Sequence, residues 1–396
     1  MPSSPYRRAV VLVLDGFGVG AAPDAAAFGD VGADTFANAV AAAGGITLPN
    51  LRRLGLGCIH TVPGLGPADA PTASFGRMRE TSPAKDTISG HWEMMACPVE
   101  EPFAVFPGGF PEEIVREFCE EAGVAGVLGN RAASGTEILE DLAEEHERTA
   151  LPILYTSADS VFQLAAHLDV VPLDRLYAWC ESARRLLDAH RVGRVIARPF
   201  RGRAGSYVRT YDRRDFSMAP PGETVLDRLA AKGIAAVGVG KISDIFSGRG
   251  LSASVHTEGN RDGMAATVGL LADLEGGLVL VNLVDTDMLY GHRRDPVGFV
   301  RCLEEFDEDL GVLLEHLREG DLLAISADHG CDPTFAKTTD HTREEVPLLL
   351  FDAARRCGVD LGVRETFADL GATVSEALGA GTPASGRSLL PSLAAA

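Results

Sequence analysis

Short hydrophobic runs recur along the chain and alternate with segments of helical periodicity. The runs are Ala9–Leu14, Ile153–Tyr155, Val192–Ala197, Ile234–Gly240, Gly277–Val284, Leu322–Ser326 and Val346–Phe351. The helical patterns cover Glu137–Arg148, Leu173–Asp188, Glu223–Lys232, Met264–Leu274 and Val297–Arg318. Continuous apolar runs are typical of parallel strands, because both faces of such a sheet are covered. The alternation therefore predicts an α/β fold, with a mostly parallel sheet flanked by helices.

Two stretches rich in proline and glycine interrupt this pattern. One is Pro98–Gly109 and the other is Pro220-Pro221-Gly222. Such stretches are typical of domain boundaries, where few contacts cross the chain. They predict a smaller α/β domain over 99–221, inserted into a discontinuous core domain formed by 1–98 and 222–396.

Composition indicates which kinds of partner and which cellular compartment suit the protein. The 396 residues carry a formal net charge of −20 and are 46% hydrophobic and 23% charged, which is ordinary for a globular protein. Nucleic acids and anionic membranes recruit basic surfaces, so this charge argues against both as partners. The seven cysteines are widely spaced without a C-x-x-C pair, and no apolar run reaches membrane length. We therefore expect a cytoplasmic protein with reduced thiols.

Carboxylates and imidazoles follow three of the predicted strands. Ligands of open α/β sheets bind at the carboxyl ends of the strands. The residues found there, or soon after, are Asp15, Asp287, His292, Asp328, His329 and His341. A single aspartate at a strand end is equally consistent with a helix N-cap. Mixed Asp/His sets suit Mn²⁺, Zn²⁺ or Fe²⁺, whereas all-oxygen sets suit Mg²⁺ or Ca²⁺. Six ligands exceed one tetrahedral site, so they predict two metal ions, about 3.5–4 Å apart.

A polar stretch, Ser82–Glu93, contains candidate nucleophiles. Metal coordination lowers the pKa of a hydroxyl and orients it. On chemistry alone, Thr87 and Ser89 are both candidates. A competing motif, the G-x-G-x-x-A pattern Gly16–Ala21, would bind a dinucleotide only if a helix began there. Pro23 and Gly29 argue against that helix.

Several motifs together carry a family resemblance. They are Lys85-Asp86-Thr87-x-x-Gly90-His91-Trp92-Glu93, Tyr155–Val161, Gly240–Phe246, Tyr290–Asp295 and Asp340–Glu344. The chain thereby resembles the phosphopentomutase family of the alkaline phosphatase superfamily. The resemblance implies an isomerase of nucleoside and pentose phosphate metabolism. It would interconvert ribose 1-phosphate and ribose 5-phosphate, and the 2-deoxyribose pair, through a phosphothreonine enzyme and a bisphosphate intermediate.

The resemblance also assigns roles to residues. It implies one Mn²⁺ held by Asp287, His292 and His341, and another held by Asp15, Asp328 and His329. Thr87 would bridge them as the phosphorylated nucleophile. The residues that it implies for binding the sugar phosphate are Ser157, Asp159, Arg198, Lys241 and one of Arg209 and Arg213. A sugar bisphosphate such as glucose 1,6-bisphosphate would prime the enzyme, and the inserted domain would act as a cap that orients the substrate.

Three other functions compete with this interpretation. A cofactor-independent phosphoglycerate mutase typically has a serine nucleophile and a longer chain, so Thr87 disfavours it. A plain metal-dependent phosphatase of the same superfamily would share the ligand set. A non-catalytic protein that binds metals or sugar phosphates would be expected to lack a ligand or the nucleophile, and none is missing here.

Overall fold

The chain divides into two compact units. The computed structural model describes residues 5–157, 160–355 and 358–394. Unit 1 comprises Met1–Glu101 and Pro220–Ala396, and unit 2 comprises Pro102–Ala219. These boundaries fall a few residues inside the expected insertion, 99–221. The role of unit 2 as a substrate-orienting cap stays a prediction.

Unit 1 is built on a sheet of eight strands within the described residues, in the order β10-β9-β11-β1-β12-β13-β2-β14. The strands are β1 (Arg8–Leu14), β2 (Ser74–Met78), β9 (Ala236–Val239), β10 (Ala253–Val255), β11 (Gly277–Leu283), β12 (Asp321–Ser326), β13 (Val346–Asp352) and β14 (Asp360–Arg364). Strands β10, β9, β11, β1 and β12 are parallel. Strand β13 runs antiparallel to both β12 and β2. The predicted α/β class is confirmed, with an antiparallel strand added to the parallel sheet.

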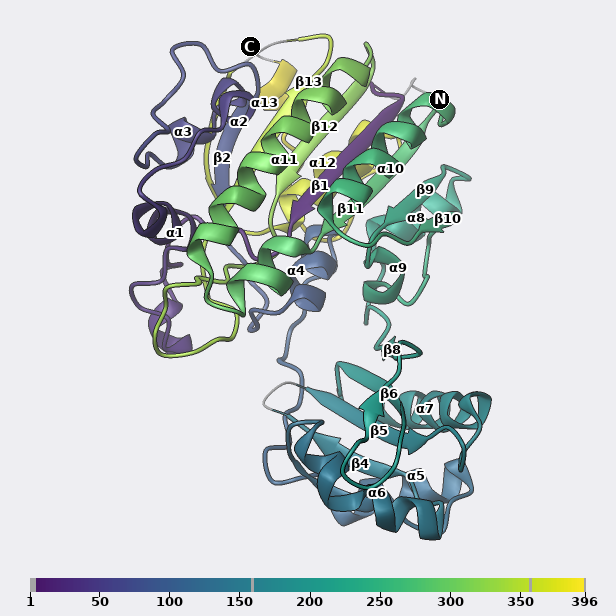
Figure 1. Ribbon diagram of the computed structural model, residues 1–396. Coiled ribbons are helices and arrows are strands. Elements are labelled where there is room, and N and C mark those ends of the chain that lie inside the picture. Colours follow the sequence, from purple (N-terminus) through teal and green to yellow (C-terminus); the bar gives the residue numbers. More distant parts are fainter. Residues whose placement is uncertain (1–4, 158–159, 356–357, 395–396) are drawn as a thin grey trace. The chain divides into compact units, whose positions relative to one another are not determined.

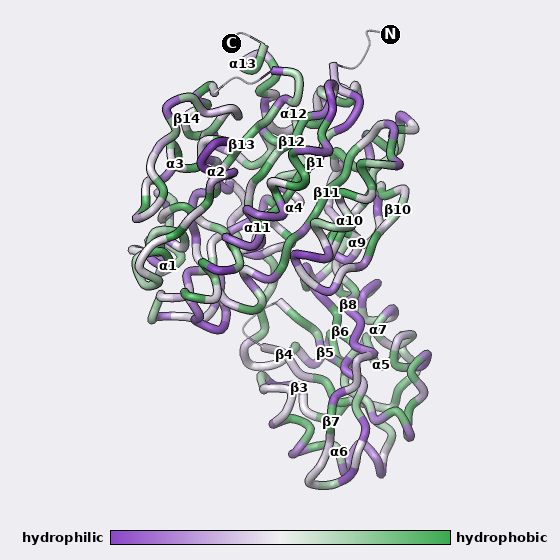
Figure 2. The backbone as a smooth tube through the Cα atoms, turned by 45° about the horizontal axis from the view of Figure 1, so that its top comes forward, coloured by the Kyte–Doolittle hydropathy of each residue, from purple (hydrophilic) through white to green (hydrophobic). Residues whose placement is uncertain are grey.

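Strand β1 occupies the centre of this sheet. It pairs in parallel with β11 on one side, from Arg8 opposite Gly277, and with β12 on the other, from Arg8 opposite Asp321. All of its residues are buried, and hydrophobic colours run along it and its two neighbours in Figure 2. The carboxyl ends of the three strands consequently lie side by side at one edge.

Helices cover both faces of the sheet in unit 1. They are η1 (Ala25–Phe28), α1 (Thr35–Ala43), α2 (Pro49–Leu54), α3 (Leu56–Ile59), α4 (Thr87–Met94), α8 (Val225–Ala231), α9 (Ile242–Ile245), α10 (Asn260–Asp273), the π-helical turn η2 (Thr286–Gly291), α11 (Pro296–His316), α12 (Ala368–Ala377) and α13 (Leu390–Ala394). Helices α10 and α11 pack together in front of the sheet in Figure 1, and α12 lies behind it. None of the helices in the described part of the chain is long and apolar enough to cross a membrane.

Unit 2 has its own sheet and its own core. In the described residues its six strands are β3 (Leu128–Ala132), β4 (Ile153–Thr156), β5 (Val161–His167), β6 (Arg194–Arg201), β7 (Val208–Arg209) and β8 (Arg214–Ser217). Its helices are α5 (Glu112–Ala122), α6 (Glu137–Thr149) and α7 (Leu173–Leu187). Helices α5 and α7 pack on one face around Phe118 and Trp179, and α6 packs elsewhere around Ile138. The amphipathic patterns predicted over 137–148 and 173–188 thus correspond to real helices.

Candidate active site

The central strands deliver the predicted metal ligands to one place. Asp15 follows β1, Asp287 lies in η2 directly after β11, and the pair Asp328 and His329 follows β12. Because β1 pairs in parallel with both β11 and β12, these ends meet at the same edge of the sheet. His341 comes from the segment between β12 and β13.

Asp287, His292 and His341 form one group of potential ligands. His292 Nε2 lies 3.3 Å from one carboxylate oxygen of Asp287, and His341 Nε2 lies 3.6 Å from the other. The two Nε2 atoms are 3.1 Å apart. The π-helical turn η2 brings Asp287 and His292 close together, because the backbone amide of His292 donates to the carbonyl oxygen of Asp287, five residues earlier.

Asp15 and His329 form a second group, which shares Asp287 with the first. His329 Nε2 lies 3.4 Å from Asp15 Oδ1 and 3.4 Å from Asp328 Oδ2. The rings of His329 and His341 stack with centroids 3.9 Å apart, so the two groups adjoin. All six residues predicted from the sequence therefore lie in one continuous cluster.

Backbone contacts orient two of the imidazoles. His292 Nδ1 is 2.6 Å from the carbonyl of Thr339, and His329 Nδ1 is 3.1 Å from the carbonyl of Gly330. A carbonyl oxygen only accepts, so each Nδ1 carries a hydrogen, and in the neutral ring each Nε2 is then the nitrogen whose lone pair can bind a metal ion. Such an outer contact is what fixes the tautomer of a metal-ligating histidine.

The carboxylates of the cluster fit divalent metal ions. Among the described residues, Asp15 Oδ1, Asp287 Oδ1 and Asp328 Oδ2 are buried oxygens without a hydrogen-bond partner. Buried polar atoms are nearly always satisfied, and buried charges are paired or coordinate metals. The second carboxylate oxygen of Asp15 and of Asp328 accepts a hydrogen bond. Asn282 Nδ2 donates to Asp15 Oδ2 at 2.8 Å, and Gly16 N donates to Asp328 Oδ1 at 3.1 Å. The free oxygens thus face the imidazole nitrogens.

Burial and close charges perturb the titration of the cluster. Burial would raise the pKa of Asp287, but His341 and His292 beside it hold that pKa far below its usual range. The hydrogen bond to Asp287 raises the pKa of His292 to about 9. Burial, with His329 alongside, lowers the pKa of His341 to about 3. Buried neighbouring groups whose pKa values are shifted strongly in opposite directions are typical of functional sites.

Thr87 begins helix α4 beside this cluster. Its Oγ1 lies 3.2 Å from His329 Nε2. Asp86 caps the helix by accepting from the amides of Ile88 and Ser89. Ser89 is occupied elsewhere, because its hydroxyl donates to Glu80 and to Asp86. The geometry favours Thr87 over Ser89 as the hydroxyl directed at the cluster.

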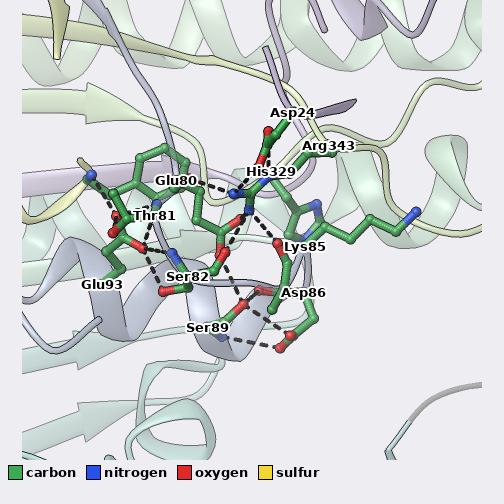
Figure 3. A network of polar contacts seen from close by, with 12 residues as sticks. Asp24, Glu80, Thr81, Ser82, Lys85, Asp86, Ser89, Glu93, His329 and Arg343 are labelled. Carbon is green, nitrogen blue, oxygen red and sulfur yellow. Dashed lines mark hydrogen bonds and ion pairs between the residues drawn. The ribbon is translucent and has the colours of Figure 1, made fainter. Parts of the chain in front are cut away.

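A buried polar network anchors the segment that leads into Thr87 (Figure 3). Arg343 donates to the Glu80 carboxylate at 2.7 Å, to the carbonyls of Ser82 and Ala84, and to the carboxylate of Asp24. Glu80 in turn accepts from Ser89. These contacts tie residues 80–89 to the segment between His341 and β13.

Glu93 closes the other end of this network. Its carboxylate accepts hydrogen bonds from the backbone amides and hydroxyls of Thr81 and Ser82 (Figure 3). It also accepts from the Thr366 hydroxyl and the Phe367 amide. A fully buried carboxylate is stabilised by such donors, so Glu93 holds the end of α4 against two loops.

The predicted sugar-phosphate residues are divided between the units. Ser157, Arg198, Arg209 and Arg213 belong to unit 2, whereas Lys241 precedes α9 in unit 1. Asp159 lies outside the described residues. Within unit 1, the charge of Lys241 contributes to lowering the pKa of Asp15, which burial alone would raise, so Lys241 lies near the cluster.

Within unit 2, three arginines surround Tyr155. Burial raises the pKa of Tyr155, and the charges of Arg198, Arg209 and Arg213 oppose that rise. Burial, together with the charge of Arg213, lowers the pKa of Arg198. Its Nε donates to Gln163 Oε1 at 3.1 Å, which is a neutral acceptor. This is a concentration of positive charge in an otherwise acidic protein.

Sequence reasoning missed the residues that support these groups. Asn282, Thr286 and Gln163 orient predicted site residues, but each is an ordinary polar residue in a strand or turn. His91 and Glu93 stand in a motif that the sequence does show. Their role depends on contacts with distant segments, so only the motif itself could have drawn attention to them.

Comparison with known proteins agrees with this geometry. The family model of the metalloenzyme superfamily matches residues 7–381. A phosphopentomutase of Anaeromyxobacter sp. (strain K) is 60% identical over 373 residues, which cover 94% of this chain and 96% of that protein. A phosphopentomutase of Syntrophotalea carbinolica is 54% identical over 374 residues, 94% of each chain. The fold resembles that of Leishmania mexicana phosphoglycerate mutase, with a TM-score of 0.50, 13% identity and 98% of each chain covered.

Proposed function

The chain belongs to the phosphopentomutase family, and we propose that its metal-ligand cluster and Thr87 carry out that reaction. The enzyme interconverts ribose 1-phosphate and ribose 5-phosphate, and the corresponding 2-deoxyribose phosphates. The observation that carries the site assignment is the 3.2 Å approach of Thr87 Oγ1 to His329 Nε2, inside a cluster in which each of the three aspartates has one buried oxygen without a hydrogen-bond partner among the described residues.

In the proposed reaction, phosphorylated Thr87 transfers its phosphoryl group to the free hydroxyl of a pentose monophosphate. The P–O bond to Thr87 breaks as the bond to the sugar oxygen forms, which gives a pentose bisphosphate. The bisphosphate then returns its other phosphoryl group to Thr87 and leaves as the isomer. Helix α4 presents the Thr87 hydroxyl at its first position, so the nucleophile is held by a rigid element.

Two divalent ions, which we propose to be Mn²⁺, fit this cluster. Asp287, His292 and His341 would hold one ion, and Asp15, Asp328 and His329 the other, and the Thr87 hydroxyl lies beside the second group, 3.2 Å from His329 Nε2. The mixture of carboxylates and imidazoles suits Mn²⁺ better than a purely oxygen-seeking ion. When bound, such ions neutralise phosphoryl charge and lower the pKa of a neighbouring hydroxyl.

The arginines of unit 2 and Lys241 would bind the phosphate that is not being transferred. Arg198 is held by a neutral amide, so its charge is available to an anion. Arg213 is already engaged by the Asp215 carboxylate, with two contacts of 2.8 Å. We therefore propose that Arg209, rather than Arg213, accompanies Arg198. Guanidinium groups suit bidentate phosphate binding.

Two further properties belong to the same proposal. A sugar bisphosphate such as glucose 1,6-bisphosphate would phosphorylate Thr87 before the first turnover. The enzyme would work in the cytoplasm on small sugar phosphates. Cys58, Cys97 and Cys119 are among six free cysteines in the described residues, which supports a reducing compartment.

A coupled assay with ribose 5-phosphate tests the reaction and its metal requirement together. We expect no turnover after complete metal removal and recovery when Mn²⁺ is added back. Parallel assays measure turnover of 3-phosphoglycerate and release of free phosphate. Full activity in the metal-free enzyme would refute the two-metal proposal, and rapid phosphate release without isomerisation would make the protein a phosphatase.

Peptide mapping after priming with glucose 1,6-bisphosphate tests the nucleophile. We expect phosphate on Thr87, none in Thr87→Ala, and continued labelling of Thr87 in Ser89→Ala, the matched hydroxyl two residues away. Label that disappears in Ser89→Ala but persists in Thr87→Ala would exchange the roles of the two residues.

A further inference from the structure

Helix α4 packs directly against the backbone of Asp328. A Cβ built on Gly90 would lie 2.3 Å from the carbonyl oxygen of Asp328, far inside van der Waals contact. Only glycine therefore permits this approach at position 90. The next residue of the helix, His91, is 1% exposed and lies at the same junction.

His91 contacts the nucleophile and a predicted metal ligand with one atom. Its Nδ1 lies 2.8 Å from the carbonyl oxygen of Thr87 and 3.3 Å from Asp328 Oδ2. Carbonyl and ionised carboxylate oxygens only accept hydrogen bonds. The hydrogen therefore sits on Nδ1, which donates it to the Thr87 carbonyl, and Asp328 Oδ2 lies beside the same nitrogen. The Nε2 atom is buried and has no hydrogen-bond partner among the described residues, so all polar contact of the ring passes through Nδ1.

Asp328 depends on this contact to keep its orientation. Its Oδ1 accepts from the backbone amides of Gly16 and His329, both at 3.1 Å. Within the part of the chain that the structure describes, its Oδ2 has no hydrogen-bond partner, and it lies 3.3 Å from His91 Nδ1 and 3.4 Å from His329 Nε2. Rotation of the carboxylate about its Oδ1 contacts is thus limited on the other side by the His91 ring.

We propose that His91 is a positioning residue, which holds the Thr87 nucleophile and the Asp328 carboxylate in one geometry, because its Nδ1–H is donated to the Thr87 carbonyl and lies beside Asp328 Oδ2. This inference rests on the site proposed above and adds a residue to it. His91 itself touches neither substrate nor reacting atoms. Loss of such an outer contact typically costs about 10–100-fold in metal affinity or activity.

Two amide substitutions separate this role from simple filling of the core. The amide nitrogen of asparagine reaches the place of imidazole Nδ1, whereas the amide nitrogen of glutamine reaches the place of Nε2. His91→Asn should therefore keep the contact, and His91→Gln should lose it although it preserves more volume. His91→Phe keeps the ring and removes every donor. A residue that only fills space would rank these variants by size.

The measurements are kcat and KM for ribose 5-phosphate, the affinity for Mn²⁺ by calorimetry on the metal-depleted protein, and the phosphorylation of Thr87 by intact mass. We expect His91→Asn to remain within about threefold of the wild type, while His91→Gln and His91→Phe lose about 10–100-fold in kcat and Mn²⁺ affinity with little change in KM. Intact mass should also show less phosphate on Thr87 in the same two variants.

A matched control comes from unit 2. His146 is likewise fully buried, and among the described residues its ring nitrogens make hydrogen bonds to the backbone of Leu151 and His167. His146→Phe should lower thermal stability without changing Mn²⁺ affinity. The proposal is overturned if His91→Gln matches the wild type, or if His91→Asn is as impaired as His91→Phe. Should His91→Phe fail to fold, the Asn/Gln pair still decides. Failure of wild-type protein to bind Mn²⁺ or label Thr87 would instead refute the proposed function.

Discussion

The Arg343–Glu80 ion pair makes a strong prediction about stability. Both side chains are 3% exposed, at a distance of 2.7 Å. Arg343→Met keeps much of the side-chain volume but leaves the Glu80 carboxylate buried without its partner. Breaking a buried pair in this way costs about 3–5 kcal/mol in the free energy of unfolding.

Removing the carboxylate charge as well should restore part of that loss. In Arg343→Met/Glu80→Gln no buried charge is left unpaired. The remaining losses are the hydrogen bonds from Arg343 to the carbonyls of Glu80, Ser82 and Ala84, worth about 0.5–1.5 kcal/mol each, and its contacts with the half-exposed Asp24 carboxylate; both variants share these losses. The double variant should therefore be more stable than Arg343→Met by about 2 kcal/mol, although it carries one more substitution.

The dependence on pH gives an independent check of the same reasoning. Burial already raises the pKa of Glu80 well above its usual value, and Arg343 opposes that rise. Without Arg343 the folded pKa climbs further above the unfolded value of about 4.3. The folded state then binds more protons, so stability is lost as the pH rises through that interval. The deficit of Arg343→Met relative to the wild type should be smaller at low pH than at high pH.

Urea denaturation monitored by circular dichroism at several pH values measures these quantities. Arg8→Met is the matched control, because Arg8 and Asp321 form a comparable buried pair, with side chains 4% and 3% exposed, at the amino end of β1. It should destabilise the fold similarly, yet retain turnover under conditions where the protein is folded. A double variant less stable than Arg343→Met would refute the argument from unpaired charge.

Three further predictions follow from other parts of the structure. Chelation should lower the melting temperature, since Mn²⁺ at about 1,000 times its Kd adds roughly 4 kcal/mol of stability; an unchanged melting temperature would contradict metal binding by the folded cluster. Burial raises the pKa of Glu344 to about 7, so the wild type should lose roughly 3 kcal/mol of stability as the pH rises from about 4.5 to 7. Glu344→Gln should lack this slope, and equal slopes in chemical denaturation would count against the assignment. Gln163→Leu frees the Arg198 guanidinium and should raise KM for ribose 5-phosphate by about tenfold, because a hydrogen bond to a charged group is worth about 1.5–3 kcal/mol; calorimetry should find Mn²⁺ affinity unchanged.

The hydrophobic runs predicted the central strands well, because the signal for a strand buried on both faces lies within its own few residues. Strands β1, β11 and β12 are buried on both faces, and each reads as a continuous apolar segment. Strand β2 alternates buried and partly exposed residues over only five positions, and no apolar run marks it. The antiparallel direction of β13 depends on its partners β12 and β2, which the composition of Val346–Asp352 does not reveal.

The same distinction applies to the site. The ligands could be predicted because Asp and His at successive strand ends are few and chemically distinctive. The supporting contacts could not be predicted, since Arg343 meets Glu80 and His91 meets Asp328 across 200 residues or more of intervening chain. On chemistry alone Ser89 and Thr87 are equal candidates, and only the resemblance chooses Thr87; the fold turns the Thr87 hydroxyl toward His329 and the Ser89 hydroxyl toward Glu80.

The position of β1 at the centre of the sheet has a consequence for synthesis. Its two neighbours, β11 and β12, begin at Gly277 and Asp321, so β1 pairs only after more than 250 further residues have been made. Unit 2 is continuous in sequence and complete by Ala219, well before either neighbour leaves the ribosome. The inserted unit can therefore fold first, while the hydrophobic segment Arg8–Leu14 remains an unpaired strand that chaperones or early helices must shield. Asp15, which follows β1, thus reaches its place in the catalytic cluster only when β11 and β12 have joined β1.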